Sequence, residues 1–234
     1  MNNLIALIPA RSGSKRIPHK NIKRLGDHPL LAYTIEVAKQ SGIFDDVVVS
    51  TENLEIEKIA QYYGAGVIRR PEKFAQDDSP DIEWIKWTFD IIETHYLRKF
   101  DYFTILRPTN PFRTPEMIRK AWKQYDEGYW LKGIQPVSEH PEKMWTRTLT
   151  YTFPYTNQNR HHLPTQLLPP VYIQNGSIEI RPCKEIEPKS IQGFHTKGYD
   201  GFDINTEKDW VYAEWLIANG KVKLIKIAKE SWRG

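Results

Sequence analysis

The sequence predicts an α/β fold in which a mainly parallel sheet is covered by helices on both faces. Short apolar runs alternate with segments of helical periodicity through the first 137 residues, which is typical of strand–helix–strand units with right-handed crossovers. The chain has 234 residues, of which 40% are hydrophobic and 12% aromatic. That length and composition suffice for one large domain with a substantial core. We therefore treat residues 1–234 as a single domain.

The first predicted strand is the apolar run NLIALIP at residues 3–9, which ends in turn-forming residues. A helix follows from Pro29 to Ser41, because apolar residues recur there at helical spacing, and Gly42 marks its end. Three further elements continue the alternation, namely a strand at 45–51, a helix at 53–64 and a short strand at 65–71.

A longer helix is predicted from Ser79 to Leu97, where apolar residues again recur along one side. A fourth strand at 100–108 is followed by a helix that begins at Thr114 and has Pro115 in its first turn, a position that favours proline. A fifth strand is predicted at 132–137. The first four strands are each followed by a helix, as parallel pairing requires.

The alternation breaks at residues 138–174, which hold five prolines, two adjacent histidines and scattered aromatic residues. A segment of this length without periodicity is uncommon inside a compact domain. We expect it to leave the domain and to pack on another surface, such as a partner subunit. Strands at 174–182 and 198–205 and a helix at 206–220 are predicted to return to the sheet.

Composition excludes several classes of protein. The net charge is only +4, and charges of both signs are mixed along most of the chain, so no nucleic-acid partner is expected. Cys183 is the single cysteine, which excludes a disulfide framework and a thiolate zinc site. The sequence shows no signal-peptide pattern and no apolar run near 18 residues, so we expect a cytoplasmic protein with no membrane partner.

A basic loop follows the first strand: residues 11–24 contain six Lys or Arg and no acid. Ligands bind at the carboxyl ends of strands in open α/β sheets. Gly13 lets backbone amides approach an anion closely, and Arg11, Lys15 and Lys20 can neutralise phosphate oxygens. We interpret the loop as a polyphosphate site; the alternative is a solvated basic loop. It matches neither the Walker A nor the Rossmann glycine motif, because Gly13 is the only glycine between Met1 and Gly26.

Polar residues also follow two later strands. The segment LRPTNPFR places a group at the end of the fourth strand, namely Arg107, Thr109, Asn110 and Arg113. Asp203 and Asn205 in FDIN are two residues apart, so in a strand they would share a face. Their oxygens would suit Mg²⁺, which takes one or two protein ligands together with phosphates and water. The alternative for Asp203 is an acid that is hydrogen-bonded at a strand-to-helix turn.

Other polar residues are assigned to structure. Thr206 and Asp209 have nearly the spacing of a capping box and are predicted to begin the last helix. His161 and His162 are adjacent and lack the helical spacing of a paired metal site, so exposed or interfacial positions are expected. The sequence shows no nucleophile motif, and the predicted chemistry is displacement at phosphorus without a covalent intermediate.

Five blocks occur together and in order: LIPARSGSKRIPHKNI, VVVSTENLEIEKIAQYYGAGVIRRPEKFAQDDSP, LRPTNPFRTPEMI, QNGSIEI and DINTEKD. They resemble the acylneuraminate cytidylyltransferases, the CMP-sialic acid synthetase family, across nearly the whole chain. The resemblance implies a Rossmann-like nucleotidyltransferase fold and a homodimer in which the inserted segment 138–174 reaches the other subunit's site. It also implies transfer of CMP from CTP to a nonulosonic acid of the sialic, legionaminic or pseudaminic type, with Mg²⁺ as cofactor and release of pyrophosphate.

The resemblance implies roles for individual residues by motif position. The implied CTP-binding residues are Ala10, Arg11, Ser14, Lys15, Lys20, Asn21 and Arg70, the last near the cytosine. Arg11 and Lys20 would hold the leaving phosphates, and Asp203, the first acid of a D-x-D metal pair, would hold Mg²⁺ together with Asn205. These assignments make Arg11, Lys20 and Asp203 the predicted catalytic residues. Lys143 matches the basic residue that the inserted segment offers to the sugar acid.

The departures from the family pattern lie around the acceptor. Arg107 replaces a glutamine, Thr165 and Ile173 replace arginines, and Asn205 replaces the second acid of the metal pair. Either Arg107, Thr109 and Lys143 bind the sugar acid, or the acceptor differs and is a shorter keto-sugar acid or another hydroxylated acid or phosphate. A third possibility is a nucleotide-binding module without turnover, which only Asn205 supports. A sugar-1-phosphate nucleotidyltransferase is disfavoured because the opening loop lacks the glycine-rich motif of that class.

Overall fold

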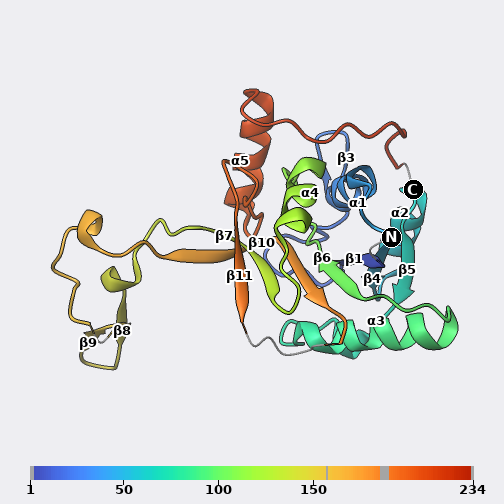
Figure 1. Cartoon of the computed structure of the whole chain (residues 1–234). Helices are drawn as coiled ribbons and strands as arrows, with labels where there is room; N and C mark the ends of the chain where they lie inside the picture. Colours follow the sequence, from blue (N-terminus) through green and yellow to red (C-terminus); the bar gives the residue numbers. More distant parts are fainter. Residues whose placement is uncertain (1–2, 157, 185–189, 233–234) are drawn as a thin grey trace.

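The computed structural model describes residues 3–156, 158–184 and 190–232. Its centre is a seven-stranded sheet in the order β11-β7-β10-β6-β1-β4-β5 (Figure 1). The strands of this sheet are β1 (Leu4–Pro9), β4 (Asp46–Thr51), β5 (Gly66–Arg69), β6 (Tyr102–Ile105), β7 (Trp130–Pro136), β10 (Tyr172–Pro182) and β11 (Ile191–His195). The helices are α1 (Leu30–Ser41), α2 (Leu54–Tyr62), α3 (Asp81–His95), α4 (Pro115–Gln124) and α5 (Glu207–Ala218).

The sheet is mainly parallel, as predicted. β1 pairs in parallel with β4 and with β6, β4 pairs in parallel with β5, and β7 pairs in parallel with β11. Only β10 runs the other way, antiparallel to both β6 and β7. A two-stranded ribbon of β2 (Arg24–Leu25) and β3 (His28–Pro29) connects the basic loop to α1. The parallel strands therefore direct their carboxyl ends to one edge, where the basic loop begins.

Both faces of the sheet are covered by helices (Figure 1). Ile5 and Leu7 of β1 pack with α3 on one face, whereas Ala6 and Ile8 pack with α1, α2 and α4 on the other. This alternation follows from the period of two along a strand. β1 is buried on both faces, which explains why it reads as a continuous apolar run. Among the described residues no helix is long and apolar enough to cross a membrane.

Three helices begin at the polar residues that the sequence offers. The Asn53 side chain accepts hydrogen bonds from the backbone N–H groups of Glu55 (2.9 Å) and Ile56 (3.1 Å) at the start of α2. Thr114 accepts from the Met117 N–H at α4. At α5, Thr206 and Asp209 form a capping box, which confirms that prediction. Such caps fix where each helix starts and therefore where the preceding loop ends.

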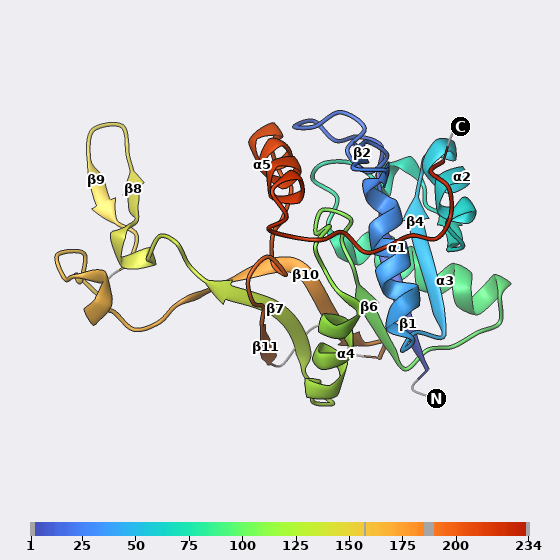
Figure 2. The ribbon, with the colours of Figure 1, turned by 90° about the horizontal axis from the view of Figure 1, so that it is seen from above.

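Residues 138–171 of the predicted segment 138–174 leave the domain as an extended arm, whereas residues 172–174 already belong to β10 and pair with β7 (Figures 1 and 2). The arm carries η2 (Pro141–Lys143), β8 (Trp145–Arg147), β9 (Thr152–Pro154) and η3 (Thr165–Leu167). Several of its aromatic side chains are exposed, namely Trp145, Tyr151, Phe153 and Tyr155. The departure from the domain matches the prediction, and its packing on a partner subunit stays a prediction.

The predicted strand at 198–205 is wrong. These residues form turns, with Asp200 N–H donating to Lys197 O (3.0 Å) and Phe202 N–H donating to Tyr199 O (3.0 Å). The edge strand is β11, which the sequence analysis did not predict. Gly193 of β11 lies so close to β7 that a Cβ there would overlap the Ile134 side chain. A glycine is therefore needed for this close pairing, and it interrupts the alternation of side chains by which a strand is predicted.

Candidate functional site

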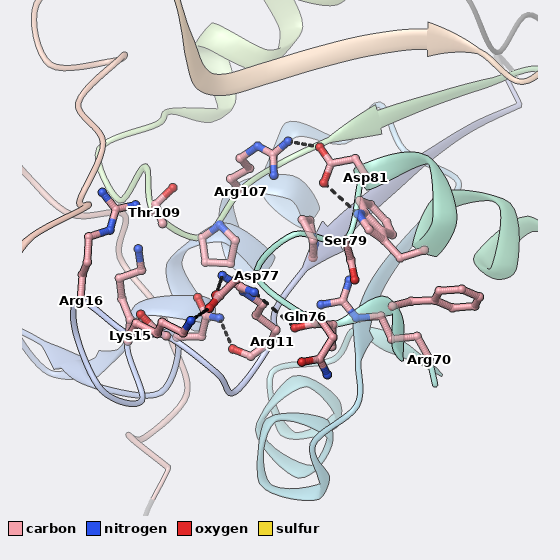
Figure 3. Close-up of a pocket in the computed structure, with 18 residues that line it drawn as sticks. Arg11, Lys15, Arg16, Arg70, Gln76, Asp77, Ser79, Asp81, Arg107 and Thr109 are labelled. Atoms are coloured by element: carbon pink, nitrogen blue, oxygen red, sulfur yellow. Dashed lines mark hydrogen bonds and ion pairs between the residues drawn. The ribbon is translucent and has the colours of Figure 1, made fainter. Parts of the chain in front are cut away.

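A cavity of about 560 Å³ lies at the carboxyl ends of β1, β5 and β6 (Figure 3). The structure brings together here most of the residues that the sequence singled out. Those that line the cavity are Arg11, Ser14, Lys15, Lys20, Asn21, Arg70, Arg107 and Thr109. They come from three loops that are far apart in sequence, and they meet because parallel strands end at one edge.

Arg11 and Lys15 share a carboxylate in this structure. Asp77 Oδ1 lies 2.7 Å from Arg11 Nη2, and Asp77 Oδ2 forms an ion pair with Lys15 (Figure 3). The hydrogen bond with Lys15 lowers the pKa of Asp77 and raises the pKa of Lys15. Arg11 also donates to the carbonyl of Ala75 (3.3 Å). The two cations therefore hold the loop that precedes α3.

Lys20 and Asn21 are the more enclosed members of the basic loop. Lys20 Nζ donates to the Ile204 carbonyl at 2.9 Å. Burial lowers the pKa of Lys20, and the charge of Asp203 only partly opposes this effect. Asn21 donates to the Arg11 carbonyl (2.8 Å) and so fixes the loop backbone. Ala10 is fully buried behind the loop and does not line the cavity, and its N–H donates to Ser50 O.

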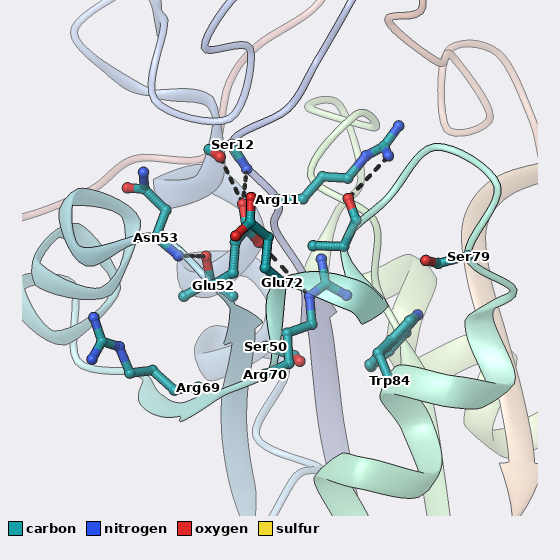
Figure 4. Close-up of polar contacts among 12 residues, drawn as sticks. Arg11, Ser12, Ser50, Glu52, Asn53, Arg69, Arg70, Glu72, Ser79 and Trp84 are labelled. Atoms are coloured by element: carbon teal, nitrogen blue, oxygen red, sulfur yellow. Dashed lines mark hydrogen bonds and ion pairs between the residues drawn. The ribbon is translucent and has the colours of Figure 1, made fainter.

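Arg70 forms the inner wall of the cavity. Its side chain is buried, its guanidinium carbon lies 5.8 Å from the centre of the Trp84 ring, and burial lowers its pKa. Glu52, which the sequence analysis missed, lies behind it, with Oε2 3.8 Å from Arg70 Nε. The other oxygen of Glu52 accepts from the Ser12 N–H (2.6 Å) and hydroxyl (2.7 Å) (Figure 4). The sequence does contain a signal for Glu52, because this acid directly follows β4 and so lies at the carboxyl end of a parallel strand.

Arg107 lines the cavity from the loop after β6 and has two acidic partners. Its guanidinium contacts Asp81 at the start of α3 and lies 3.6 Å from Glu179 of β10. Asp81 also accepts from the Trp84 indole N–H at 2.9 Å. The carboxylates raise the pKa of Arg107 against the effect of its burial, and the Arg107 charge lowers the pKa of Asp81. Asp81 and Glu179 were not predicted, because their pairing joins elements that are remote in sequence.

Arg113 is structural in this geometry. It is almost completely buried and donates to the backbone carbonyls of Arg107 (3.0 Å) and Gly176 (3.3 Å). Burial lowers its pKa to about 9. Asn110 donates to the Phe202 carbonyl at 2.6 Å, and the Thr109 carbonyl accepts from the Ile204 N–H at 2.9 Å. These bonds attach the loop after β6 to residues 202–204.

Asp203 and Asn205 lie beside each other, although not for the predicted reason, since they are not on a strand. Asn205 Nδ2 donates to Asp203 Oδ2 at 2.7 Å, and Arg16 donates to Asn205 Oδ1 at 3.5 Å. Asp203 Oδ1 is buried and has no hydrogen-bond partner among the described residues. An orphaned carboxylate oxygen is the kind of ligand that a hard cation takes, although neither Asp203 nor Asn205 lines the cavity and the nearby charge of Lys20 opposes a cation there. No group of three or more His, Cys, Asp or Glu that could hold a metal occurs in the described part of the chain.

Lys143 lies on the arm, and the structure does not bring it to the cavity of its own chain. Its ammonium donates to the carbonyls of His161 and Leu163, both at 2.6 Å. The His161 ring packs edge-on against Trp145 and His162, with ring centres 5.0 and 5.8 Å away. Lys143 therefore braces the arm in this chain, and a role toward the acceptor would require a second chain.

Comparison with known proteins gives four findings. The cytidylyltransferase family model matches residues 5–210. The CMP-N,N'-diacetyllegionaminic acid synthase of Legionella pneumophila is 34% identical, over 95% of this chain and 99% of that protein. The N-acylneuraminate cytidylyltransferase of Escherichia coli O18:K1:H7 is 44% identical over 52% of this chain and 28% of that protein. Among solved structures, CMP:2-keto-3-deoxy-manno-octonic acid synthetase complexed with CTP has a TM-score of 0.67, at 16% identity over 93% of this chain and 99% of its own, which supports the fold.

Proposed function

The chain belongs to the cytidylyltransferase family, and we propose that it transfers CMP from CTP to a nonulosonic sugar acid of the sialic, legionaminic or pseudaminic type, with release of pyrophosphate. The family match and the identity to the Legionella synthase confirm the family predicted from the sequence. The chain is therefore a nucleotidyltransferase. The choice of acceptor rests on the names of the relatives.

The observation that carries the proposal is the convergence of cations on one cavity. The basic loop contributes Arg11, Lys15 and Lys20, and Arg70 enters from the end of β5. A polyphosphate is the ligand that such a group suits, because several guanidinium and ammonium groups can each contact a different oxygen. Arg70, which packs near the buried Trp84 ring, offers hydrogen-bond donors to a base at the inner wall.

The proposed reaction is an in-line displacement at the α-phosphorus. The anomeric hydroxyl of the sugar releases its proton to solvent and forms the new O–P bond, while the bond between the α-phosphorus and the oxygen that bridges to the β-phosphate breaks and pyrophosphate leaves. Arg11 and Lys20 neutralise the charge that develops on the leaving group. Positioning and fixed charges supply most of the rate enhancement in such transfers.

Mg²⁺ is proposed as the cofactor. Asp203 Oδ1 would be its protein ligand because this oxygen is buried and lacks a partner in the described chain. The Asn205 amide oxygen would be a second, neutral ligand, which requires that it release Arg16. Bound there, Mg²⁺ would supply Lewis-acid stabilisation of phosphate charge.

The acceptor and the assembly follow from the rest of the site. Arg107 and Thr109 are proposed to bind the acceptor, since they line the cavity from the loop after β6, which is separate from the basic loop. We also propose a homodimer in which the arm of one subunit brings Lys143 to the site of the other. The exposed aromatic residues of the arm support an interface there. A different acceptor remains the second candidate, because Arg107 already has two carboxylate partners.

Pyrophosphate release tests the proposal in one experiment. The purified protein is incubated with CTP and Mg²⁺ and with a panel of nonulosonic acids, a shorter keto-sugar acid and sugar phosphates. We expect Mg²⁺-dependent release with one nonulosonic acid. Release only with another acceptor would support the second candidate. No release with any acceptor, together with CTP-dependent thermal stabilisation, would instead indicate a nucleotide-binding module without turnover.

A further inference from the structure

Asp77 occupies the position of a ligand anion between two proposed phosphate-binding residues. One carboxylate oxygen lies 2.7 Å from Arg11 Nη2, and the other forms an ion pair with Lys15. A carboxylate offers these cations the same kind of charged oxygen that a phosphate would offer. Arg11 and Lys15 are therefore already neutralised by the protein, and a polyphosphate that used them would have to replace Asp77.

The ion pairs lie at the boundary between two cavities. The main cavity of about 560 Å³ is adjoined by a second cavity of about 360 Å³. Residues that line both are Arg11, Ser14, Lys15, Ala75, Gln76 and Asp77. Moving the Asp77 carboxylate away from Arg11 and Lys15 would therefore connect the two spaces and lengthen the basic groove.

Movement of the segment that carries Asp77 breaks no hydrogen bond within the sheet, although a shift that includes Ala75 also breaks the 3.3 Å hydrogen bond from Arg11 to the Ala75 carbonyl. Residues 75–79 lie between η1 (Glu72–Phe74) and α3 and belong to no helix or strand. Their other side-chain bonds are local: Gln76 donates to the Glu72 carbonyl and Ser79 to the Lys73 carbonyl, both at 2.9 Å. The side chains of Asp77 and Lys15 are 37% and 83% exposed, so breaking their contact uncovers no core.

We propose that Asp77 is a displaceable internal counter-ion that competes with ligand phosphates for Arg11 and Lys15. It weakens binding of every ligand whose phosphates reach these two cations and leaves binding of an uncharged nucleoside unaffected. It thereby sets the affinity of the site for polyphosphates and keeps the ligand-free basic loop attached to the segment before α3. The identification of the ligand as CTP rests on the proposed function.

Calorimetric titration with CTP and with inorganic triphosphate, in EDTA to exclude metal bridging, tests this role. D77N removes the competing charge, and we expect it to bind both ligands about fivefold more tightly, because two partly exposed ion pairs no longer have to be broken. D78N is the matched control, since it removes the same charge one residue later, where the described chain shows no ion pair and only a weaker, longer-range effect on Lys15. It should change the affinity much less. D77S is a second neutral replacement, and agreement between D77S and D77N would show that the effect comes from loss of the charge and not from the asparagine side chain. Circular dichroism checks that each variant is folded.

The salt dependence gives a second readout. In the wild type one anion replaces another on Arg11 and Lys15, so the Kd should depend weakly on NaCl concentration, whereas D77N should show a steeper dependence. Equal affinities and salt slopes in D77N and D78N would overturn the proposal, and so would weaker binding in D77N. When the titration is repeated with Mg²⁺ in place of EDTA, binding of triphosphate without binding of CTP would contradict the proposed function while leaving the counter-ion role measurable. Binding of neither ligand under either condition would overturn both.

Discussion

Replacing Lys20 with methionine separates the structural cost of a buried cation from its use in the reaction. The Lys20 ammonium is enclosed near Asp203, donates to the Ile204 carbonyl at 2.9 Å and lines the cavity. Burial lowers its pKa, which means that the folded chain holds the charged form at a cost. Methionine keeps a flexible unbranched stem and removes the charge.

The two expected effects of K20M differ in size and in kind. Loss of one hydrogen bond costs about 1 kcal/mol, and relief of the desolvated charge offsets it, so the free energy of unfolding should stay within about 1 kcal/mol of the wild type. Loss of a charge-assisted contact with the leaving phosphates should cost about 3–4 kcal/mol of transition-state stabilisation, or roughly two to three decades in kcat/KM. K20R, which keeps a cation, should lose much less.

The pH dependence gives an independent check of the same residue. Because the pKa of Lys20 lies below its ordinary 10.5 in the folded chain, the charge is lost at lower pH than in the unfolded chain. The kcat/KM of the free enzyme should fall as pH rises through that value. The free energy of unfolding attributable to Lys20 should rise with pH between the folded-state pKa and 10.5, because the unfolded chain binds the proton more readily.

Initial rates of pyrophosphate release and urea denaturation of wild type, K20M and K20R measure these effects. In K20R the alkaline decline of kcat/KM should move to higher pH, since a guanidinium keeps its proton. The reasoning would be refuted if K20M retained more than about a tenth of the wild-type kcat/KM, which leaves less than 1.4 kcal/mol for the contact. It would equally fail if K20M lost activity only because it unfolded.

Three further substitutions test the metal site, the thiol and a helix cap. N205D restores a second acid beside Asp203, and we expect Mn²⁺ binding measured by electron paramagnetic resonance to tighten about tenfold, because hard cations favour charged oxygens; unchanged binding would place the metal elsewhere. Burial raises the pKa of Cys183 from 9.0 to about 12, so the native thiol should react slowly with a disulfide reagent at pH 8 and rapidly in urea. The free energy of unfolding should fall as pH rises from about 9 to about 12, and C183S should lack this fall. N53A should lower the free energy of unfolding by about 1 kcal/mol in urea titrations, because two accepted hydrogen bonds at the start of α2 are lost; N53D should retain most of it.

The strands that the sequence predicts well are those buried on both faces. β1 and β4 are continuous apolar runs because helices cover both sides, and the pattern therefore reports their environment directly. β11 is an edge strand in which Phe194 is buried while Ile191 and His195 are exposed, so its pattern is weak. The aromatic residues at 198–205, which suggested a strand, instead pack against the loop after β6, where the ring centres of Phe202 and Phe112 are 5.4 Å apart.

The cations of the site were predictable and their acidic partners were not. A basic loop at a strand end is a local signal, because both the strand and the charges are contiguous in sequence. Asp77 meets Arg11 across 66 residues, and Glu179 meets Arg107 across 72. Such pairs depend on how loops converge over the sheet edge, which the periodicity of single elements does not encode.

The charges around the cavity bear on how an acidic acceptor could bind. Among the described residues, six cationic side chains line the cavity, namely Arg11, Lys15, Arg16, Lys20, Arg70 and Arg107, against the two acids Asp77 and Asp81. A triphosphate that displaces Asp77 would use most of the cations of the basic loop. Arg107 remains, with Asp81 as its close partner, whereas Glu179 at 3.6 Å is shared with Arg181 (2.6 Å) and Lys132 (3.8 Å), so part of the Arg107 charge is already neutralised. We therefore propose that a keto-acid acceptor also contacts a cation of a second subunit. Lys143 of the arm is the proposed residue, and it would have to release the carbonyls of His161 and Leu163 to which its ammonium donates in this chain.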